Sequence, residues 1–254
     1  MPGLRSGDVP VDLHCHVLPG IDDGARDLGD AVAMGWQANA DGIEAICATP
    51  HIRDDHDVRL DELPARREEL SAALLAAGCP VRILAGGEVG AAVVDRLDDA
   101  ELTQLTLGGA GRWILLEPHP GPIDGRLEHV MASLAARGFS ALIAHPERHL
   151  GPELPGVLRA AIARGALVQA TAACFTDAIT ASGMRELSEQ GLIHVLGSDA
   201  HSARAGRPVT LSPALAVLGE IEPAARHITW MSRTAPSGII GGLEVTPPFA
   251  ARAR

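Results

Sequence analysis

The chain of 254 residues contains neither lysine nor tyrosine, and it has only three tryptophans and three phenylalanines. All 21 basic residues counted as Lys+Arg are therefore arginine. Without lysine, the protein cannot use Schiff-base catalysis or a Walker-type phosphate loop, and without tyrosine it has no tyrosine general acid. Its chemistry must come from histidine, aspartate, glutamate, cysteine, serine, threonine or arginine.

Long apolar runs, basic clusters and paired cysteines are also missing. No segment reaches the roughly 20 apolar residues of a membrane span, and the N-terminus does not resemble a secretion signal, so we expect a cytoplasmic protein. A formal net charge of -11 disfavours binding to nucleic acid. The four cysteines are scattered without a CxxC pair, which predicts reduced thiols rather than disulfides or a thiolate zinc site.

Short aliphatic runs alternate with Ala/Leu-rich stretches, which is typical of βα units around a parallel sheet. Strands are expected at Val9–Leu13, Ile43–Ala48, Val81–Leu84, Trp113–Leu116, Ala141–Ala144, Leu167–Ala170 and Leu192–Leu196. Helices are expected at Asp27–Ala40, Asp61–Ala77, Ala91–Leu97, Ile123–Arg137, Leu154–Ala163 and Asp177–Gln190. The pattern predicts one α/β domain over residues 1–254, a complete or distorted barrel with its core at about residues 9–240 and a disordered tail beyond Thr246.

Six of the seven predicted strands end in a residue type that binds metal ions. These residues are His14 and His16, His51, Glu88, Glu117, His145, and Asp199 with His201. The C-terminal ends of the strands of a parallel barrel meet at one mouth. His14 and His16 are two residues apart, so their side chains point to the same face of a strand. A single histidine at a strand end is more often a packed residue, but the repeated pattern predicts a metal site.

The mixture of imidazole and carboxylate side chains suits Zn, Mn or Fe(II), and more than four such ligands predict two or more ions that share bridging carboxylates. Several neighbouring ions can activate a water, neutralise a phosphate and stabilise a leaving oxygen. The sequence therefore predicts hydrolysis of a phosphate ester.

These motifs resemble those of the PHP (polymerase and histidinol phosphatase) superfamily. The resemblance rests on Asp12-Leu-His14-Cys-His16, Ala48-Thr-Pro-His51, Glu88, Ile143-Ala-His145-Pro-Glu-Arg148 and Gly197-Ser-Asp199-Ala-His201. Two segments, Leu18–Gly24 and Ala144–Arg148, are similar to those of bacterial manganese-dependent protein-tyrosine phosphatases from capsular and exopolysaccharide operons. The resemblance runs in order from about Val11 to Pro208 and implies a distorted (β/α)7 barrel, the PHP fold, with three divalent ions, manganese first among the metals.

The resemblance also implies the ligands and the mechanism. The first ion would take His14, His16, Glu88 and Asp199, the second Glu88, Glu117 and His145, and the third Asp23, His51 and His201. Arg148 and Arg207 would hold the phosphate with their planar guanidinium groups, while a metal-bridging hydroxide attacks phosphorus. The proton for the leaving oxygen could come from His201, from a water or from no acid at all.

A rival mechanism needs weighing, because Cys47 and Arg53 have the CxxxxxR spacing of cysteine-based tyrosine phosphatases. Pro50 removes one backbone donor from that loop and no glycine makes the loop easier to form, so a core position for Cys47 is the stronger hypothesis.

The roles of some other residues stay open. Arg204 lies three residues from Arg207 and is the alternative to it as a phosphate ligand. Glu147 is either a carboxylate that orients a ligand histidine or a solvated loop residue. Four further histidines, His56, His119, His149 and His194, are expected outside the metal set.

Two other functions remain open. The first is hydrolysis of histidinol phosphate or of another small phosphomonoester, which would use the same ions. The second is a protein of a different functional class, a barrel that binds metal or a partner without catalysis. The implied partner is a phosphotyrosine protein, and the tyrosine-rich tail of a polysaccharide-biosynthesis kinase is the candidate that the resemblance offers. Metal identity and oligomeric state are not readable from the residues.

Overall fold

The computed structural model describes residues 10–121 and 125–251 and contains nine short strands, which pair only in parallel. The strands are β1 Val11–Cys15, β2 Ala45–Ala48, β3 His51–Ile52, β4 Arg82–Leu84, β5 Glu88–Gly90, β6 Trp113–Glu117, β7 Ser140–Ile143, β8 Leu167–Thr171 and β9 Val195–Gly197. The α-helices are α1 Leu28–Ala40, α2 Leu63–Ala76, α3 Asp99–Leu105, α4 Gly125–Ala136, α5 Leu154–Ala163, α6 Ala181–Glu189, α7 Ser212–Leu218 and α8 Ala235–Ile240.

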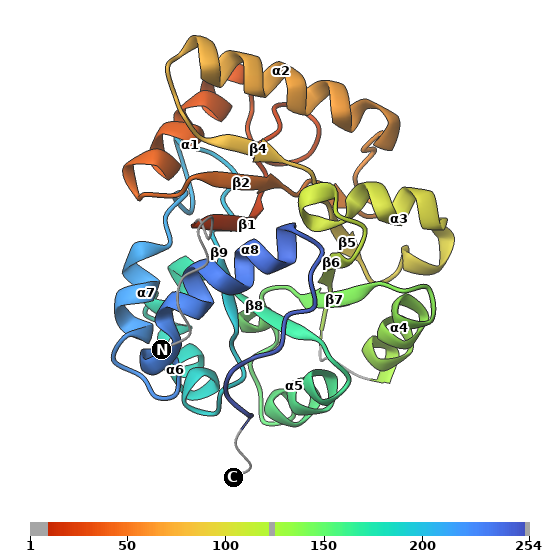
Figure 1. Cartoon of the computed structure of the whole chain (residues 1–254), viewed down its shortest axis with the longest axis vertical. Helices are drawn as coiled ribbons and strands as arrows, with labels where there is room; N and C mark the ends of the chain where they lie inside the picture. The colour runs from red at the N-terminus through yellow and green to blue at the C-terminus, as the bar shows by residue number, and fades with distance from the viewer. Residues whose placement is uncertain (1–9, 122–124, 252–254) are drawn as a thin grey trace.

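The strands form one curled sheet in two hydrogen-bonded parts, β1-β2-β4 and β3-β5-β6-β7-β8-β9. Two of the predicted strands are each followed, after a break, by a short strand that was not predicted: β3 follows β2 after Thr49-Pro50, and β5 follows β4 after residues 85–87. Proline has no N–H to donate to a ladder, which explains the first break. Cys15 forms a parallel bridge with Ala200, directly after β9, so the sheet curls back to its first strand. The predicted distorted barrel is confirmed, with helices around it in Figure 1.

The interior of the barrel is a separate apolar cluster, to which strands from all sides contribute. It includes Leu13, Trp113, Leu142 and Val195, all buried, together with Ile239 of α8. Helix α8 therefore packs across the end of the barrel opposite the strand C-termini, and Figure 1 shows it lying in front of the strands. A larger cluster joins the outer faces of the strands to the surrounding helices.

The helix expected at Ala91–Leu97 is wrong, because only a short 3-10 turn, Val94–Arg96, forms there. The helix of this βα unit is α3, which the sequence analysis missed. It begins with a capping box in which the Asp98 side chain accepts from the Glu101 N–H and the Glu101 side chain accepts from the Asp98 N–H. This Asp-x-x-Glu signal was available in the sequence.

The C-terminal part of the chain is more ordered than expected. Helices α7 and α8 and a π-helical segment, Trp230–Thr234, were not predicted. The tail expected to be disordered beyond Thr246 packs in its described part, up to residue 251, because the Phe249 ring lies 5.8 Å from that of His194 and 5.3 Å from that of His227. Val9 and Ile123, the first residues of two predicted elements, lie outside the described residues.

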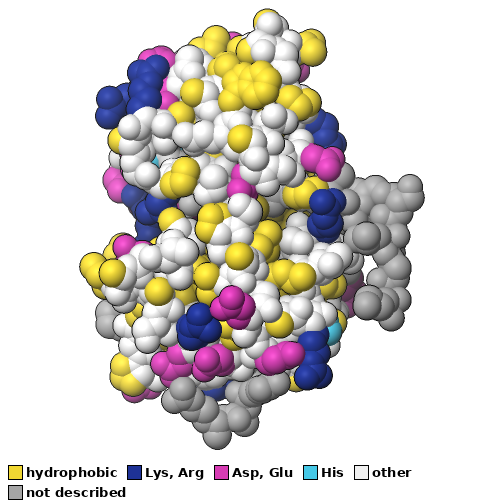
Figure 2. All heavy atoms as spheres, turned by 90° about the vertical axis from the view of Figure 1, so that its left-hand side faces the viewer, with side chains coloured by type: hydrophobic (Ala, Val, Ile, Leu, Met, Phe, Trp, Pro, Cys, Tyr) yellow, Lys and Arg dark blue, Asp and Glu magenta, His cyan; other side chains and the backbone are white. Residues whose placement is uncertain are grey.

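Figure 2 shows charged side chains of both signs on one face of the molecule. On the face shown in Figure 2, arginine side chains are separated by acidic and apolar side chains and form no continuous basic surface. Within the described ranges, none of the helices has both the length and the apolar character needed to cross a bilayer.

Candidate metal centre

The predicted ligands gather where the strands end. His14 lies in β1, His51 and Glu88 begin β3 and β5, and Glu117 ends β6. The others are His16 after β1, Asp23 in the loop before α1, His145 after β7, and Asp199 and His201 after β9. Seven of the nine are buried, while His201 is half-buried and Asp23 is exposed at the mouth.

His14 and His16 are held in matching tautomers. The Nδ1–H of His14 donates to Gln169 Oε1 at 2.9 Å, and the Nδ1–H of His16 donates to Asp22 Oδ2 at 2.9 Å. Each neutral ring therefore carries its lone pair on Nε2, and the two Nε2 atoms lie 3.2 Å apart. Two lone pairs that converge in this way fit a shared cation.

Glu88 occupies the centre of the cluster and is 0% exposed. Its Oε2 lies 3.4 Å from Nε2 of both His14 and His16 and 2.7 Å from Nδ1 of His51. Its Oε1 lies 2.6 Å from His145 Nε2. Neither Glu88 Oε2 nor His51 Nδ1 has a hydrogen-bond partner. A buried oxygen without a hydrogen bond, surrounded by imidazole nitrogens, fits a carboxylate that bridges metal ions.

Asp199 and His145 have strained backbones beside the cluster. Their φ angles are 49° and 34°, a region that non-glycine residues rarely adopt. The turn places Asp199 Oδ1 3.4 Å from His14 Nε2 and 3.5 Å from His16 Nε2, again without a hydrogen-bond partner. Such strain is typical of functional positions.

A third group lies toward solvent. Asp23 Oδ1 is 3.4 Å from Nε2 of His51 and 3.4 Å from Nε2 of His201. The rings of His16 and His201 stack with centroids 4.0 Å apart. This part of the cluster connects the buried carboxylates to the mouth.

Three sets of donor atoms lie close enough together to hold an ion each. The sets are His14, His16 and Glu88; His51, Glu88 and Glu117; and His16, Asp23, His51 and His201. They overlap with the three expected ligand groups, although His51 replaces His145 in the second set and His16 joins the third. The donor set fits divalent ions because it combines imidazole with carboxylate and shares Glu88 between two positions.

The carboxylates around the histidines favour a positive charge at the centre of the cluster. Burial lowers the pKa of His16, but the neighbouring carboxylates of Asp199, Asp22 and Glu88 outweigh burial and raise that pKa well above its ordinary value, so a metal ion that binds this ring must displace a proton. Burial raises the pKa of Glu88, but His14, His145 and His16 outweigh it and hold the pKa well below its ordinary value. The carboxylate is therefore anionic, as a metal ligand must be.

Three arginines contact the ligand carboxylates. Arg148 Nη1 lies 3.2 Å from Glu117 Oε1, and its Nη2 lies 3.3 Å from Asp199 Oδ2. Arg207 Nη2 donates to Asp199 Oδ2 at 2.8 Å. Arg53, which the sequence analysis weighed only in the cysteine motif, donates from Nη1 to both oxygens of Glu117 at 2.8 and 3.0 Å. These guanidinium groups place positive charge at the edge of the cluster.

Arg204, the alternative to Arg207, points elsewhere. Its Nη2 pairs with Asp27 Oδ1 at 3.2 Å near the start of α1, and its side chain is 55% exposed. Of the two arginines, Arg207 is the one that contacts a predicted ligand, Asp199.

Cys47 is a core residue of β2. It is 0% exposed and belongs to the apolar cluster inside the barrel. Burial raises the pKa of its thiol to about 12, so the reactive thiolate is absent at neutral pH. This geometry leaves the cysteine mechanism without a nucleophile.

Three further side chains considered in the sequence analysis, those of His56, His149 and Glu147, have the following contacts. The ring of His56, expected on an exposed loop, lies 4.6 Å from that of His51, and its side chain is 17% exposed. His149 Nδ1 donates to the carbonyl oxygen of Gly121 at 2.6 Å. Glu147 Oε1 accepts from the Thr171 N–H at 3.2 Å, so it ties the loop after β7 to the end of β8.

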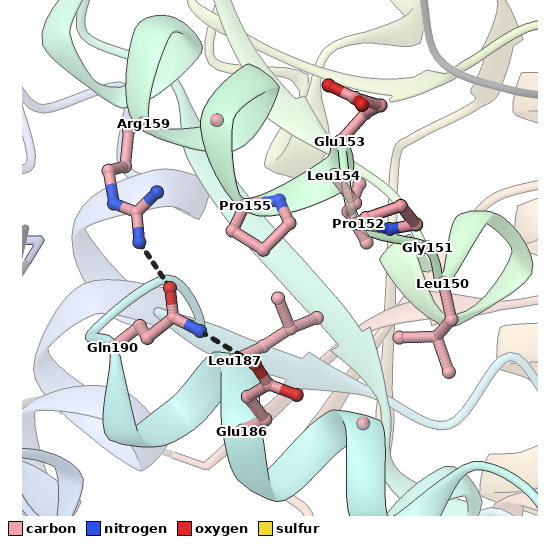
Figure 3. A pocket seen from close by; sticks show the side chains of 12 residues that line it. Leu150, Gly151, Pro152, Glu153, Leu154, Pro155, Arg159, Glu186, Leu187 and Gln190 are labelled. Atoms are coloured by element: carbon pink, nitrogen blue, oxygen red, sulfur yellow. Dashed lines mark hydrogen bonds between the residues drawn. The ribbon is translucent and has the colours of Figure 1, made fainter. Parts of the chain in front are cut away.

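Two surface hollows share the segment Leu150–Leu154, which follows Arg148 in the chain. Arg148 lines a hollow of about 340 Å³ whose other wall is the segment Leu150–Leu154. The same segment borders a hollow of about 600 Å³ between α5 and α6, where Arg159, Gln190 and Glu186 form a hydrogen-bonded row (Figure 3). Leu150 separates the two hollows and is 39% exposed. Its side chain rests on Gly183, where a Cβ atom would come within 2.8 Å of it.

A parallel barrel with histidines and carboxylates at its C-terminal mouth defines the class of metal-dependent α/β-barrel hydrolases. The family model described as capsular polysaccharide synthesis, CpsB/CapC, matches residues 10–222. The chain belongs to this family, and the relationship predicted from its motifs is confirmed.

Individual relatives agree. Tyrosine-protein phosphatase YwqE from Bacillus subtilis (strain 168) is 34% identical over 202 residues, which is 76% of this chain and 78% of the relative. A crystal structure from work on YwqE and on CpsB from Streptococcus pneumoniae, called unique metal-dependent tyrosine phosphatases, has a TM-score of 0.81 at 27% identity and covers 96% of this chain and 100% of that one. Dihydropyrimidinase from Brevibacillus agri NCHU1002 shares the fold alone, with a TM-score of 0.56 at 11% identity over 96% of this chain and 74% of that one.

Proposed function

We propose that this protein is a metal-dependent protein-tyrosine phosphatase with three divalent ions, of which Mn2+ is the expected metal. The observation that carries the proposal is the overlap of the three donor sets: two of them share the buried Glu88, and the third shares His16 with one and His51 with the other. Arg148 and Arg207 lie next to these sets, because they contact the carboxylates of Glu117 and Asp199. The activity named for YwqE supports the choice of phosphotyrosine over other phosphomonoesters.

The nine residues are assigned as ligands in the three groups that the resemblance implies, which overlap with the donor sets, although Asp199 and His145 belong to none of those sets. The groups are His14, His16, Glu88 and Asp199; Glu88, Glu117 and His145; and Asp23, His51 and His201. His51 and His16 lie close enough to serve a second ion each. This sharing would couple the three positions, so that loss of one ion weakens the others.

Divalent ions in this site supply Lewis acidity, which makes water a nucleophile at neutral pH and offsets the charge of the phosphate. Arg148 and Arg207 donate hydrogen bonds to the phosphate oxygens, which requires them to release Asp199 in part when substrate binds. His201 donates its Nδ1–H to the Asp199 carbonyl oxygen at 3.0 Å, so its Nε2 lone pair serves a metal ion. We therefore assign the proton for the leaving phenolate to solvent water.

The polypeptide around the phosphotyrosine would lie across Leu150. Arg148, which contacts the ligand carboxylates of Glu117 and Asp199, lines the first hollow, and the segment Leu150–Leu154 leads from it to the hollow between α5 and α6. A phosphorylated chain held at Arg148 must leave the mouth over some surface, and this route offers exposed apolar contact. The partner expected from the resemblance, a polysaccharide-biosynthesis tyrosine kinase, and the cytoplasmic location both stay predictions.

The experiment is phosphate release by metal-stripped protein, with and without added Mn2+, from a phosphotyrosine peptide and from histidinol phosphate in parallel. We expect Mn2+-dependent, chelator-sensitive hydrolysis that favours the peptide. Preference for histidinol phosphate would overturn the substrate and keep the metal site. Absence of hydrolysis of any phosphomonoester by metal-loaded protein would instead support the non-catalytic alternative.

A further inference from the structure

Gln169 is a buried polar residue that the expected ligand set does not use. It lies in β8, the one predicted strand that ends without a metal ligand, and it is 0% exposed. Its Oε1 accepts the Nδ1–H of His14 at 2.9 Å. Its Nε2 has no hydrogen-bond partner, although it is buried. Burial of an unpaired amide donor costs free energy, so the position of this side chain must serve some other purpose.

The hydrogen bond fixes which nitrogen of His14 is available. An amide oxygen only accepts, so it selects the tautomer with the proton on Nδ1 and the lone pair on Nε2. That lone pair points at the cluster, where Glu88 Oε2 and Asp199 Oδ1 each lie 3.4 Å from Nε2. Without the acceptor, the proton could move to Nε2 and block the position where an ion binds.

A neutral amide differs from the partner that orients the neighbouring ligand, because His16 donates to the carboxylate of Asp22. Around His14, two carboxylates already bring negative charge into a buried space. A third carboxylate there would add an uncompensated buried charge, whereas an amide orients the ring without one.

Gly197 makes room for this pair. A Cβ atom at position 197 would lie 2.6 Å from the Cβ of His14 and 2.8 Å from Nε2 of Gln169. No heavy atom fits at these distances, so β9 must carry glycine where it passes the two side chains. The sequence therefore contains three residues, from β1, β8 and β9, whose packing depends on one another.

We propose that Gln169 is a positioning residue for the metal centre, which holds His14 in the metal-binding tautomer and orientation. This inference rests on the metal binding of the proposed function. It predicts an effect on metal affinity itself, independent of substrate.

The test is titration of metal-stripped protein with Mn2+ by calorimetry, which gives affinity and number of ions. Gln169→Leu keeps the size of the side chain and removes the acceptor, and we expect it to weaken the tightest Mn2+ site by about 10- to 100-fold, the usual effect of losing such a partner. Gln169→Glu keeps an acceptor for the His14 Nδ1–H but adds the buried negative charge, which destabilises the metal-free fold. Because bound ions offset that charge, we expect the Mn2+ affinity of Gln169→Glu to exceed that of Gln169→Leu.

The matched control is Gln190→Leu, the same change at a buried glutamine that bonds to Arg159 and Glu186 away from the cluster. It should bind Mn2+ like wild type. Wild-type affinity and stoichiometry in Gln169→Leu would overturn the inference, as would an equal loss in Gln190→Leu. If Gln169→Leu fails to fold, Gln169→Met removes the same acceptor with a longer, unbranched side chain and should show the same loss, while wild-type affinity there would overturn the inference. Wild-type protein that binds no Mn2+ would mean that the proposed function itself fails.

Discussion

The sequence offers two nucleophiles for a phosphate ester, the Cys47 thiolate and a hydroxide held by metal ions, and the burial of their residues distinguishes between them. The Cys47 thiol lies inside the barrel with its pKa raised to about 12 by burial, so it stays protonated and out of reach of substrate. The histidine and carboxylate side chains instead converge at the strand ends, with Asp23 and His201 open to the mouth. At the scale of single residues, position decides the mechanism more than residue type does.

Cys47→Ser should therefore retain activity on a phosphotyrosine peptide. We expect kcat/KM within about twofold of wild type, with a loss of stability of about 1–3 kcal/mol because the new hydroxyl is buried in an apolar cluster. Steady-state kinetics below the melting temperature and a urea titration measure the two effects separately. A folded variant without activity, in a protein that ignores chelator, would contradict the metal mechanism.

The ligands could be predicted from the sequence because their residue types repeat at strand ends. The residues that orient them could not, because their role depends on partners that are distant along the chain. Gln169 is 155 positions from His14, and Arg53 is 64 positions from Glu117. No local pattern marks such a pair, so only the closed barrel reveals it.

Among the elements, the segment between the 3-10 turn Pro146–His149 and α5 has the clearest functional consequence. Arg148 lies in that turn, and Leu150 follows it at the boundary of two hollows. The segment thus joins a residue assigned to phosphate with a surface suited to polypeptide.

Leu150→Ser should discriminate between substrates. We expect kcat/KM for a phosphotyrosine peptide of ten or more residues to fall roughly 3- to 10-fold, since loss of one apolar contact costs about 1 kcal/mol, while hydrolysis of phenyl phosphate is unchanged. Leu75→Ser is the control, because Leu75 is exposed on α2 and touches neither hollow. Equal effects on both substrates, or none on the peptide, would argue against the proposed route.

The prediction of secondary structure from the sequence was right where apolar periodicity was strong, and it was wrong where a short polar signal determines the start of a helix. Helix α5 has the predicted bounds, and α1 begins one residue after the expected Asp27, which caps it. The helix expected at Ala91–Leu97 was wrong because its apolar residues pack in a loop, and the capping box at Asp98 starts the helix later.

For the molecule as a whole, the end of the barrel opposite the metal cluster matters for stability. His194 lies there in the core, where its Nδ1 accepts the Val168 N–H at 3.0 Å and Phe249 stacks on its ring. Burial lowers the pKa of His194 to about 3. The folded protein therefore keeps this ring neutral under conditions in which the unfolded chain protonates it.

This difference predicts acid sensitivity. Between the unfolded pKa of 6.5 and the folded pKa of about 3, only the unfolded chain binds the proton, so stability falls as the pH falls. The slope is about 1.4 kcal/mol per pH unit, or about 2 kcal/mol between pH 6.5 and pH 5. In urea unfolding of the metal-free proteins, wild type should lose about 2 kcal/mol more stability than His194→Gln between pH 6.5 and pH 5.

The comparison between the two proteins cancels the titration of the cluster histidines, which is common to both. His129→Gln, at an exposed position on α4, should keep the wild-type slope. An identical slope in His194→Gln and wild type would refute the assignment.

The closure of the barrel between Cys15 and Ala200 also has a consequence for synthesis of the protein. His14 and His16 leave the ribosome early, but Asp199 and His201, which complete the first and third donor groups, leave it only after some four-fifths of the chain. A nascent chain can therefore hold metal by its histidines only loosely until β9 docks beside β1. Phosphatase activity would therefore depend on synthesis of the chain through β9 and His201, and premature termination before this point would release no active fragment.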